Sequence, residues 1–228
     1  AGRQQGFAER RGLATKGRSA KEPLLNFNFM DQKPLPVAQA GQISEKTLGI
    51  HHDKLYVGYV NKGNEIRTKL EALEKGGDAS SANQTYSELR GLKNGETFAV
   101  NATYLHEYYF DTLDGDGTVP EGALKEALVA KHGSWENFVA HFSACGMAAR
   151  GWVVLAWDLQ AQDLRIYACD VHNQGGIWGC LPILVLDVYE HAYFIDFGAD
   201  RKAYIAEWFT TVNWGKAQAR LEHAQALR

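Results

Sequence analysis

The segment 181–200 constrains this chain most, because an unbroken apolar run, LPILVL, leads directly into DVYEHAYFIDFGAD. A short apolar run of this kind is typical of a fully buried strand. Asp187 ends that strand and stands four residues before His191, with Glu190 next to the histidine. An unpaired carboxylate in a buried place is costly, and a metal ion is one of the few partners that offset the cost. The segment therefore raises the hypothesis of a metal site at the end of a buried strand.

Length and composition indicate an ordinary globular protein. The 228 residues, 45% of them hydrophobic, suffice for one large domain or two small ones. The formal net charge of -3 argues against a nucleic-acid binder, because such proteins usually carry a basic face. No apolar run approaches the roughly 20 residues that span a bilayer. The three cysteines lack metal-finger spacing and are interpreted as reduced structural thiols, which favours a cytoplasmic location.

Residues 1–40 are expected to form a basic and extended N-terminal tail. Residues 1–22 contain six Lys or Arg and two Glu, and the three prolines of residues 22–41 indicate chain extended over the surface. A flexible basic tail is the simpler interpretation. A processed targeting segment is the alternative, although no apolar core of about 7–15 residues follows Arg10 and Arg11. An exported or organellar location therefore stays open beside the cytoplasmic one.

Residues 41–115 are predicted to form a helical hairpin domain. A long helix begins after Ser44, a suitable cap, and ends at a glycine pair, with a kink expected near Gly58. Its apolar residues recur at helical spacing, at Leu48, Leu55, Tyr59, Ile66, Leu70 and Leu73. A second helix over 96–113 would pack antiparallel against it. The segment 113–122, which is rich in glycine and aspartate, is interpreted as the domain linker.

Residues 116–228 are predicted to form an α/β domain, so the chain as a whole is of the α+β class. Two short helices over 121–133 and 134–149 precede strand-like runs at 151–159, 163–171 and 183–188. Turn residues between the first two runs indicate an antiparallel sheet. The closing segment, residues 201–228, is predicted to form one helix.

Three histidines lie inside predicted elements, His51, His106 and His191. His51 shares a helix face with Leu55 and Tyr59, and that face should be buried. A lone histidine in such a place is more often a hydrogen-bonded core residue than a ligand. Three of them with Asp187 make a mixed nitrogen and oxygen donor set that suits iron, manganese or zinc. His52 competes with His51 as a ligand, but its side chain points about 100° away, toward solvent or the helix partner.

Five segments occur in an order and spacing that resemble the iron/manganese superoxide dismutase family: ISEKTLGIHHDKLYVGYVN, LHEYYF, RGWVVLAW, DVYEHAYFIDF and YIAEWFTTVNW. The resemblance covers about residues 40–220. It implies a helical hairpin, a domain with a three-stranded antiparallel sheet, and a homodimer, with a tetramer as a further option. The implied ligands are His51, His106, Asp187 and His191, which would hold one Mn or Fe ion per subunit with a water or hydroxide. Its implied activity is the conversion of superoxide to dioxygen and hydrogen peroxide by redox cycling of that ion.

The resemblance also assigns roles around the metal. Glu190 matches the glutamate that bridges the dimer by hydrogen-bonding the partner's ligand histidine, with a solvated surface charge as the alternative. Tyr59 matches the gateway tyrosine and Trp152 a pocket tryptophan. Gln174 matches the glutamine near the solvent ligand at the loop position typical of manganese-type members, whereas the alternative helix position holds Ala102. Manganese is therefore favoured, and an ordinary turn residue is the alternative reading of Gln174.

Several positions depart from the family's pattern. Leu55 stands where a histidine is expected, and Phe194 where its hydrogen-bonding tyrosine across the dimer is expected. Both ends of one hydrogen bond are thus apolar, which is consistent, because removing one end alone would strand a buried polar group. Other pocket tryptophans are replaced, by Phe110, Val154 and Tyr189. A family relative with other redox chemistry and a non-catalytic descendant therefore remain as alternatives.

Overall fold

The computed structural model describes residues 29–119 and 121–227. The interpretation of residues 1–28 as a basic tail lies outside the described residues. Residues 29–39 contain no helix or strand and run along the helical hairpin. The Met30 amide donates to Asn64 Oδ1 at 2.9 Å, and Asn64 Nδ2 donates to the Met30 carbonyl at 2.8 Å. These paired bonds attach the extended segment to the hairpin.

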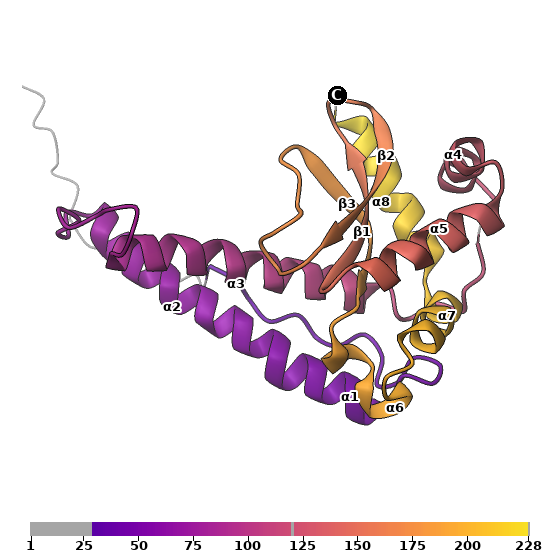
Figure 1. Cartoon of the computed structure of the whole chain (residues 1–228), viewed down its shortest axis with the longest axis horizontal. Helices are drawn as coiled ribbons and strands as arrows, with labels where there is room; N and C mark the ends of the chain where they lie inside the picture. The colour runs from indigo at the N-terminus through magenta and orange to yellow at the C-terminus, as the bar shows by residue number, and fades with distance from the viewer. Residues whose placement is uncertain (1–28, 120, 228) are drawn as a thin grey trace, which may run out of the picture.

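Two long antiparallel helices form the N-terminal hairpin and extend to the left in Figure 1. The first is continuous through α1 (Glu45–Ile50), a π-helical segment η1 (His51–Tyr56) and α2 (Val57–Glu74). The second is α3 (Glu88–Asp111), which begins earlier than predicted. Serine caps open both helices, because Ser44 Oγ accepts from the Thr47 amide and Ser87 Oγ accepts from the Arg90 amide, each at 3.2 Å.

The π-helical segment changes which side of the first helix is buried. Each wider turn of a π-helix shifts the side chains that follow it relative to a regular α-helix. Tyr56 and Val60 are accordingly buried, whereas Leu55 and Tyr59 are only half-buried. The face of His51, Leu55 and Tyr59 that was predicted to be buried is therefore buried at His51 and only half-buried at Leu55 and Tyr59. The irregularity of this helix lies at η1, before Gly58.

The second half of the chain is built around a three-stranded antiparallel sheet in the order β2-β1-β3. Its strands are β1 (Trp152–Asp158), β2 (Asp163–Cys169) and β3 (Cys180–Asp187). The helices before the sheet are α4 (Ala123–His132) and α5 (Trp135–Ala148); those after it are η2 (Glu190–Ala192), α6 (Phe194–Phe197), α7 (Arg201–Thr211) and α8 (Trp214–Ala226). The predicted α+β class, with a helical hairpin and a three-stranded antiparallel sheet, is confirmed.

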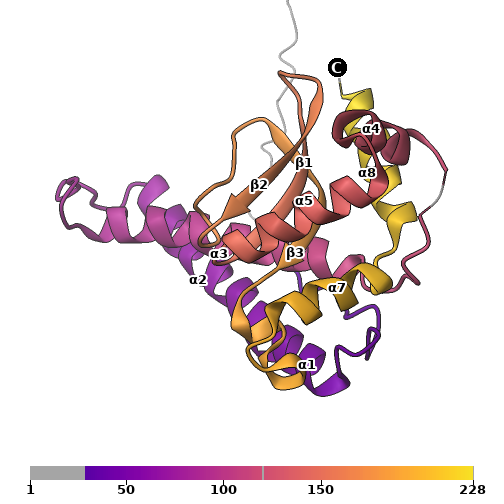
Figure 2. The same ribbon diagram turned by 45° about the vertical axis from the view of Figure 1, so that its right-hand side comes forward.

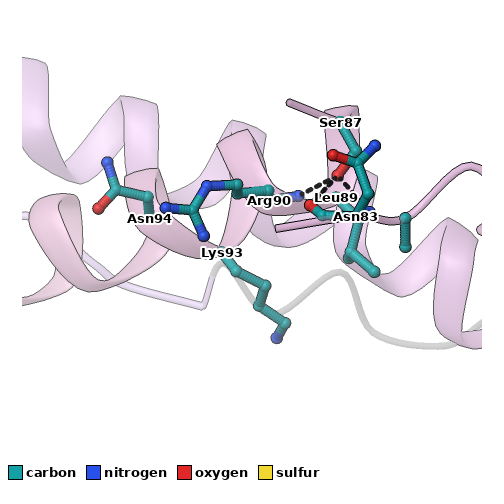
Figure 3. A pocket seen from close by; sticks show the side chains of 7 residues that line it. Asn83, Ser87, Leu89, Arg90, Lys93 and Asn94 are labelled. Atoms are coloured by element: carbon teal, nitrogen blue, oxygen red, sulfur yellow. Dashed lines mark hydrogen bonds between the residues drawn. The ribbon is translucent and has the colours of Figure 1, made fainter. Parts of the chain in front are cut away.

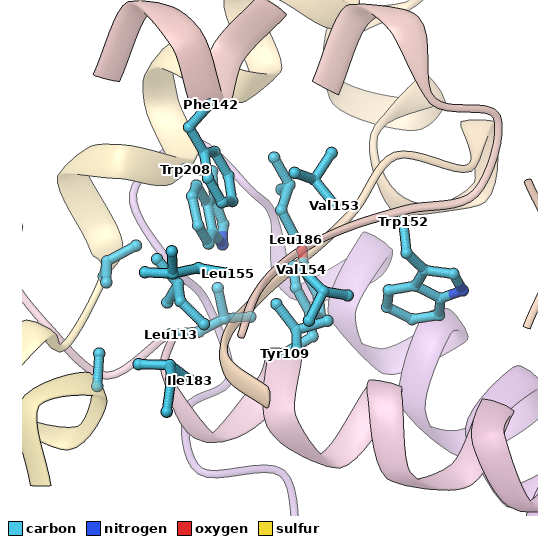
Figure 4. Close-up of a cluster of buried hydrophobic side chains, with 14 of the residues drawn as sticks. Tyr109, Leu113, Phe142, Trp152, Val153, Val154, Leu155, Ile183, Leu186 and Trp208 are labelled. Carbon is cyan, nitrogen blue, oxygen red and sulfur yellow. The ribbon is translucent and has the colours of Figure 1, made fainter. Parts of the chain in front are cut away.

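The main core lies around the central strand, which is buried along almost its whole length. Helix α5 crosses the sheet in Figure 2, and α3 and α8 contact β3. Phe142 of α5 stacks on Trp208 of α7 with ring centres 5.7 Å apart, and Figure 4 shows Val153 and Leu155 close to this pair. Because α3 belongs to the hairpin, the same core joins the two halves of the chain.

The closing segment differs from the prediction of a single helix. The closing helix is divided into α7 and α8, because Val212 is extended and Asn213 Oδ1 caps α8 by accepting from the Lys216 amide at 3.2 Å. The segment 113–122, which is predicted to link the two domains, packs against this break at Gly115. The Gly115 amide donates to the Thr211 carbonyl at 3.0 Å. Within the described residues, no helix is long and apolar enough to cross a membrane.

Candidate metal centre

Four side chains from both halves of the molecule meet at one point. His51 opens η1 and His106 lies on α3, while Asp187 ends β3 and His191 follows on η2. One ligand atom from each lies within 4.8 Å of the others, and His191 alone of the four is partly exposed. In the described part of the chain, this is the one group of three or more His, Cys, Asp or Glu residues with the geometry to hold a metal ion.

The three imidazoles converge on one carboxylate oxygen. Asp187 Oδ2 lies 3.0 Å from His51 Nε2, 3.1 Å from His191 Nε2 and 3.7 Å from His106 Nε2. The other carboxylate oxygen, Oδ1, accepts from the Tyr189 amide at 2.9 Å. That bond fixes the carboxylate so that Oδ2 faces the three rings.

His106 presents a free lone pair to this cluster. Its Nδ1 lies 2.6 Å from the Ala102 carbonyl one helical turn earlier, and a carbonyl can only accept, so Nδ1 carries the proton. Nε2 of the neutral ring is therefore unprotonated, and it is buried without a hydrogen-bond partner. Metal-ligating histidines usually donate the N–H of their other ring nitrogen to a carbonyl or carboxylate in this way, which fixes the tautomer. The residues thus fit a metal ion.

Burial and charge set the protonation of the cluster. Burial lowers the pKa of both His51 and His106, which favours the neutral form that binds metals. Burial alone would lower the pKa of His191 too, but the Asp187 carboxylate raises it. For Asp187 burial would raise the pKa, but the charge and hydrogen bond of His191, with those of His51, hold it far below its usual range. Asp187 is therefore an anion inside the protein.

A hydrogen-bonded row of side chains lies beside the cluster. Trp152 Nε1 donates to His172 Nδ1 at 3.0 Å, and His172 Nε2 lies 3.1 Å from the Tyr59 hydroxyl. Burial lowers the pKa of His172 to about 4. Burial and then Asp187 raise the pKa of Tyr59, so the phenol keeps its proton near neutral pH. The Trp152 ring meets His106 edge-on with centres 4.9 Å apart.

His172, which the sequence-based reasoning missed, takes the inner place expected for Gln174. Gln174 is exposed, and its backbone pairs with Val171 in a narrow turn. Asn173 holds this turn against the hairpin, since its Nδ2 donates to Thr97 Oγ1 at 2.9 Å. The sequence did contain a signal, because His172 and Asn173 stand directly before Gln174, but an irregular loop has no periodicity to show which side chain turns inward.

The remaining predicted residues are partly or largely exposed. Leu55 is half-buried, Glu190 is exposed beside His191, and the Phe194 side chain is 56% exposed. The neighbouring His52 is buried and lies outside the ligand cluster, because its ring nitrogens bond the Lys33 carbonyl at 2.8 Å and Asp53 Oδ1 at 2.7 Å.

Aromatic and apolar groups surround the ligands. Phe110 meets the His51 ring edge-on with centres 4.9 Å apart, and Tyr189 stacks on His191 with centres 5.2 Å apart. Val154 is buried on β1, two residues from Trp152. The rings of Phe110 and Tyr189 thus lie against two of the ligand candidates, and the low polarity of such surroundings strengthens electrostatic interactions within the cluster.

A separate hollow lies at the far end of the hairpin, where α3 begins (Figure 3). Asn83, Ser87, Leu89, Arg90, Lys93 and Asn94 line it. None of the candidate site residues is among them, so this hollow is unrelated to the metal cluster.

Fold and cluster together define a class of protein that holds one transition-metal ion between a helical hairpin and a sheet-containing domain. Two family models match the chain: the alpha-hairpin domain of iron/manganese superoxide dismutases over residues 34–114, and their C-terminal domain over residues 120–220. The chain belongs to the iron/manganese superoxide dismutase family.

Curated relatives carry the names of both metals. "Superoxide dismutase [Mn] 1" of Halobacterium salinarum is 37% identical over 196 residues, covering 84% of this chain and 94% of that protein. "Superoxide dismutase [Fe]" of Aquifex pyrophilus is 39% identical over 183 residues, covering 80% of this chain and 85% of that protein. "Superoxide dismutase [Fe]" of Saccharolobus solfataricus is 30% identical over 206 residues, covering 87% of this chain and 96% of that protein.

Proposed function

We propose that this protein is a superoxide dismutase that acts with one Mn or Fe ion held by His51, His106, Asp187 and His191. The observation that carries the proposal is the convergence of three imidazole Nε2 atoms on Asp187 Oδ2, with His106 Nε2 unprotonated and without a partner. Family membership and relatives named as dismutases of Mn and of Fe support it.

The bound ion supplies the redox chemistry, because Mn and Fe both cycle between two oxidation states. Two superoxide anions and two protons give one dioxygen and one hydrogen peroxide. The protein's residues must therefore admit an anion and supply protons. Tyr59 is half-buried next to the ligands and keeps its phenolic proton, so it is suited to proton donation. The rings of Phe110 and Tyr189, which lie against His51 and His191, would limit the water around a bound ion.

Either metal fits this donor set. The preference for manganese depended on Gln174, and that side chain lies on the exposed turn. With His172 in the inner place, the preference loses its support. We therefore propose one Mn or Fe ion per subunit.

We also propose that the protein acts as a homodimer through the face that carries Glu190. The apolar side chains of Ile50, Phe194 and Ile195 are exposed on α1 and α6, which both contact η2. A second copy would cover them and bring Glu190 within reach of the partner's ligand histidine. Such a carboxylate orients the imidazole and raises its basicity. Leu55 and Phe194 would then make an apolar contact where the family pattern has a hydrogen bond.

The test is superoxide turnover per equivalent of bound metal, measured on protein loaded separately with Mn and with Fe. Fast turnover with close to one ion per subunit is the expected result. Full occupancy with negligible turnover by both forms would contradict the proposal. It would favour another redox reaction in the pocket altered at Leu55 and Phe194.

A family descendant without catalytic function would instead lack the metal. His223→Gln serves as a control variant, because His223 is an exposed histidine on α8 and does not belong to the cluster. Its turnover and metal content should equal those of the unchanged protein.

A further inference from the structure

A histidine and a cysteine lie one helical turn apart on α5, and neither belongs to the cluster around Asp187. His141 and Cys145 are four residues apart, so their side chains share one face of the helix. His141 Nε2 and Cys145 Sγ are 3.9 Å apart. A tetrahedral Zn²⁺ with bonds of about 2.3 Å to a thiolate and about 2.0 Å to an imidazole places these two atoms about 3.6 Å apart. The pair is therefore spaced almost as two ligands of one ion.

His132, the last residue of α4, lies beside this pair. Its ring centre is 5.5 Å from that of His141. The three histidines of the cluster around Asp187 have ring centres 4.7, 4.9 and 6.1 Å apart, so the spacing of His132 and His141 falls within the same range. His132 Nε2 is buried and, within the described residues, has no hydrogen-bond partner. No bond to the protein therefore occupies this nitrogen.

The corner between α4 and α5 holds His132 close to α5. Gly133 has a φ of +85°, and its amide donates to the Val129 carbonyl at 2.8 Å. Asn137 Nδ2 donates to the His132 carbonyl at 3.0 Å, and Ser134 Oγ caps α5 by accepting from the Asn137 amide at 3.1 Å. The backbone that carries His132 is thus fixed from both helices.

Binding one ion with all three residues requires a side-chain rotation. In the described part of the chain, only the four residues around Asp187 bring three or more ligand atoms within 4.8 Å of one another. His141 is exposed and His132 is half-buried, and exposed side chains change rotamer within nanoseconds. Because the corner fixes the backbone, rotation of these two rings suffices to bring the third nitrogen to the ion.

The donor atoms suit a thiophilic ion. Thiolates select Cu(I) and Zn, and imidazoles suit Zn, whereas carboxylates and water suit Mn. Burial, then His141 and Lys131, lower the pKa of His132, which keeps its ring in the neutral form that binds metals. Burial raises the pKa of the Cys145 thiol, so it is not a reactive thiolate, and a bound ion would displace its proton. Zn²⁺ is the ion that fits both kinds of donor.

We propose that His132, His141 and Cys145 form a second metal site that binds one Zn²⁺ ion per subunit, with water completing the coordination. The ion links the end of α4 to α5 and stabilises this corner by mass action. The site does not depend on the proposed dismutase function, because none of its residues belongs to the cluster around Asp187.

Titration of the manganese-loaded protein with Co²⁺, in a reductant that contains no thiol, tests this site separately from the other. A thiolate bound to Co²⁺ gives an intense charge-transfer band in the near ultraviolet. The cluster around Asp187 contains no sulfur and cannot give this band. We expect the band to saturate at one Co²⁺ per subunit and to disappear when Zn²⁺ is added. Absence of the band would overturn the proposal, as would a band that Zn²⁺ does not remove.

Three variants assign the band to these residues. Cys145→Ser should abolish it. His141→Gln and His132→Gln should each weaken Co²⁺ binding at least tenfold, because changes outside the ligands alone weaken metal sites by roughly 10–100-fold. The matched control is Cys180→Ser, because Cys180 is also a half-buried free cysteine and its Sγ lies 3.5 Å from the Tyr167 hydroxyl. This control should keep the band and the affinity.

An unchanged band in Cys145→Ser, or an unchanged affinity in either histidine variant, would overturn the three-residue site. The manganese content of each variant, measured before the titration, checks the fold. It should equal that of the unchanged protein, because the cluster around Asp187 forms only when the two halves of the chain are packed together.

Discussion

Asp187 is the residue that makes the cluster electrostatically consistent. A fully buried carboxylate without partners would cost several kcal/mol, about 3–5 in the case of a broken buried pair. Here three imidazole nitrogens face one of its oxygens and a backbone amide holds the other. A divalent or trivalent ion among these groups adds positive charge where burial has removed water. Asp187 would be the one anionic side chain among the four residues and would face an opposite charge in place of the water that burial removed.

His106 gives the sharpest test of the ligand set, because its Nε2 has no partner within the described residues. His106→Gln should reduce the bound metal from about one ion per subunit to well below half, since loss of a group that merely hydrogen-bonds a ligand already weakens metal sites by roughly 10–100-fold. Metal content by mass spectrometry after dialysis checks this. The exposed His223→Gln on α8 should retain full occupancy, and unchanged occupancy in His106→Gln would remove His106 from the ligand set.

The four residues of the cluster could be predicted from the sequence, whereas the hydrogen-bonding partner of Tyr59 could not. His51, His106, Asp187 and His191 lie on or directly next to regular elements, where spacing fixes direction. His172 lies in a loop, where direction depends on contacts such as the one between Asn173 and Thr97. Gln174 and His172 are two residues apart, and only those contacts decide which of them turns inward.

At the scale of elements, the π-helical segment η1 positions the site. It begins at His51, and the wider turn brings Tyr56 and Val60 into the core while Leu55 and Tyr59 stay half-buried. Such segments are rare and occur frequently at functional sites. Apolar spacing predicts a regular helix here, because the pattern of one helix cannot show an extra residue in a turn. The break between α7 and α8 was missed for a similar reason, although Asn213 is a typical cap.

Asp196 ties α6 to the start of the ligand-bearing helix. Its Oδ2 accepts from the Ser44 amide at 2.8 Å and from Thr47 Oγ1 at 2.6 Å. Burial alone would raise the pKa of Asp196, but the hydrogen bonds from Thr47 and Ser44 lower it in the folded protein. The stability from this charge is therefore present above the unfolded pKa of about 4 and is lost as the pH falls through the lower folded pKa.

Asp196→Asn should consequently lower the free energy of unfolding by about 0.5–1 kcal/mol at pH 7, a value reduced for solvent screening. The difference from the unchanged protein should shrink as the pH falls below about 4. Urea unfolding of the two proteins at equal metal content measures the difference at pH 7 and its dependence on pH. The exposed Asp31→Asn serves as control. If the difference in the free energy of unfolding stays the same from pH 7 to below pH 4, the effect comes from packing and the charge of Asp196 makes no contribution.

Gly115 marks the place where the segment between the two halves packs against the α7–α8 break. A Cβ there would lie 2.3 Å from the Asn213 nitrogen and from the Val212 carbonyl atoms, which are backbone and cannot rotate away. Gly115→Ala should therefore destabilise the protein by about 2–3 kcal/mol. Gly91→Ala, on α3 with nothing within 4 Å of the added Cβ, should instead stabilise it by about 0.5–1 kcal/mol. Similar unfolding midpoints for the two variants would contradict this packing.

At the scale of the whole molecule, the metal centre depends on the packing of the two halves. The hairpin supplies His51 and His106, and the sheet-containing half supplies Asp187 and His191. An ion that binds all four residues binds the packed form better than any opened form. By mass action it therefore stabilises the contact between α3 and β3 along with the site. With the proposed ion bound, the cluster and the joint between the halves would form one cooperative unit.

The proposed dimer extends this unit across the face formed by Ile50, Glu190, Phe194 and Ile195. Phe194→Glu should shift the protein toward monomer and weaken dimerisation at least tenfold, because an unpaired carboxylate would be buried against a second copy. Sedimentation velocity over a range of concentrations measures this. Met147→Glu is the matched control, since Met147 on α5 is 51% exposed, close to the 56% of Phe194.

The oligomeric state of Met147→Glu should not change. If Phe194→Glu and Met147→Glu both dimerise as strongly as the unchanged protein, the surface around Phe194 is not the dimer interface. If Phe194→Glu becomes a monomer that keeps its metal and its turnover, the interface stands, but Glu190 is not needed to orient the partner's ligand histidine. A monomer that loses turnover while retaining the ion is the expected outcome, because His191 is the partly exposed ligand and would lose the carboxylate that the second copy supplies.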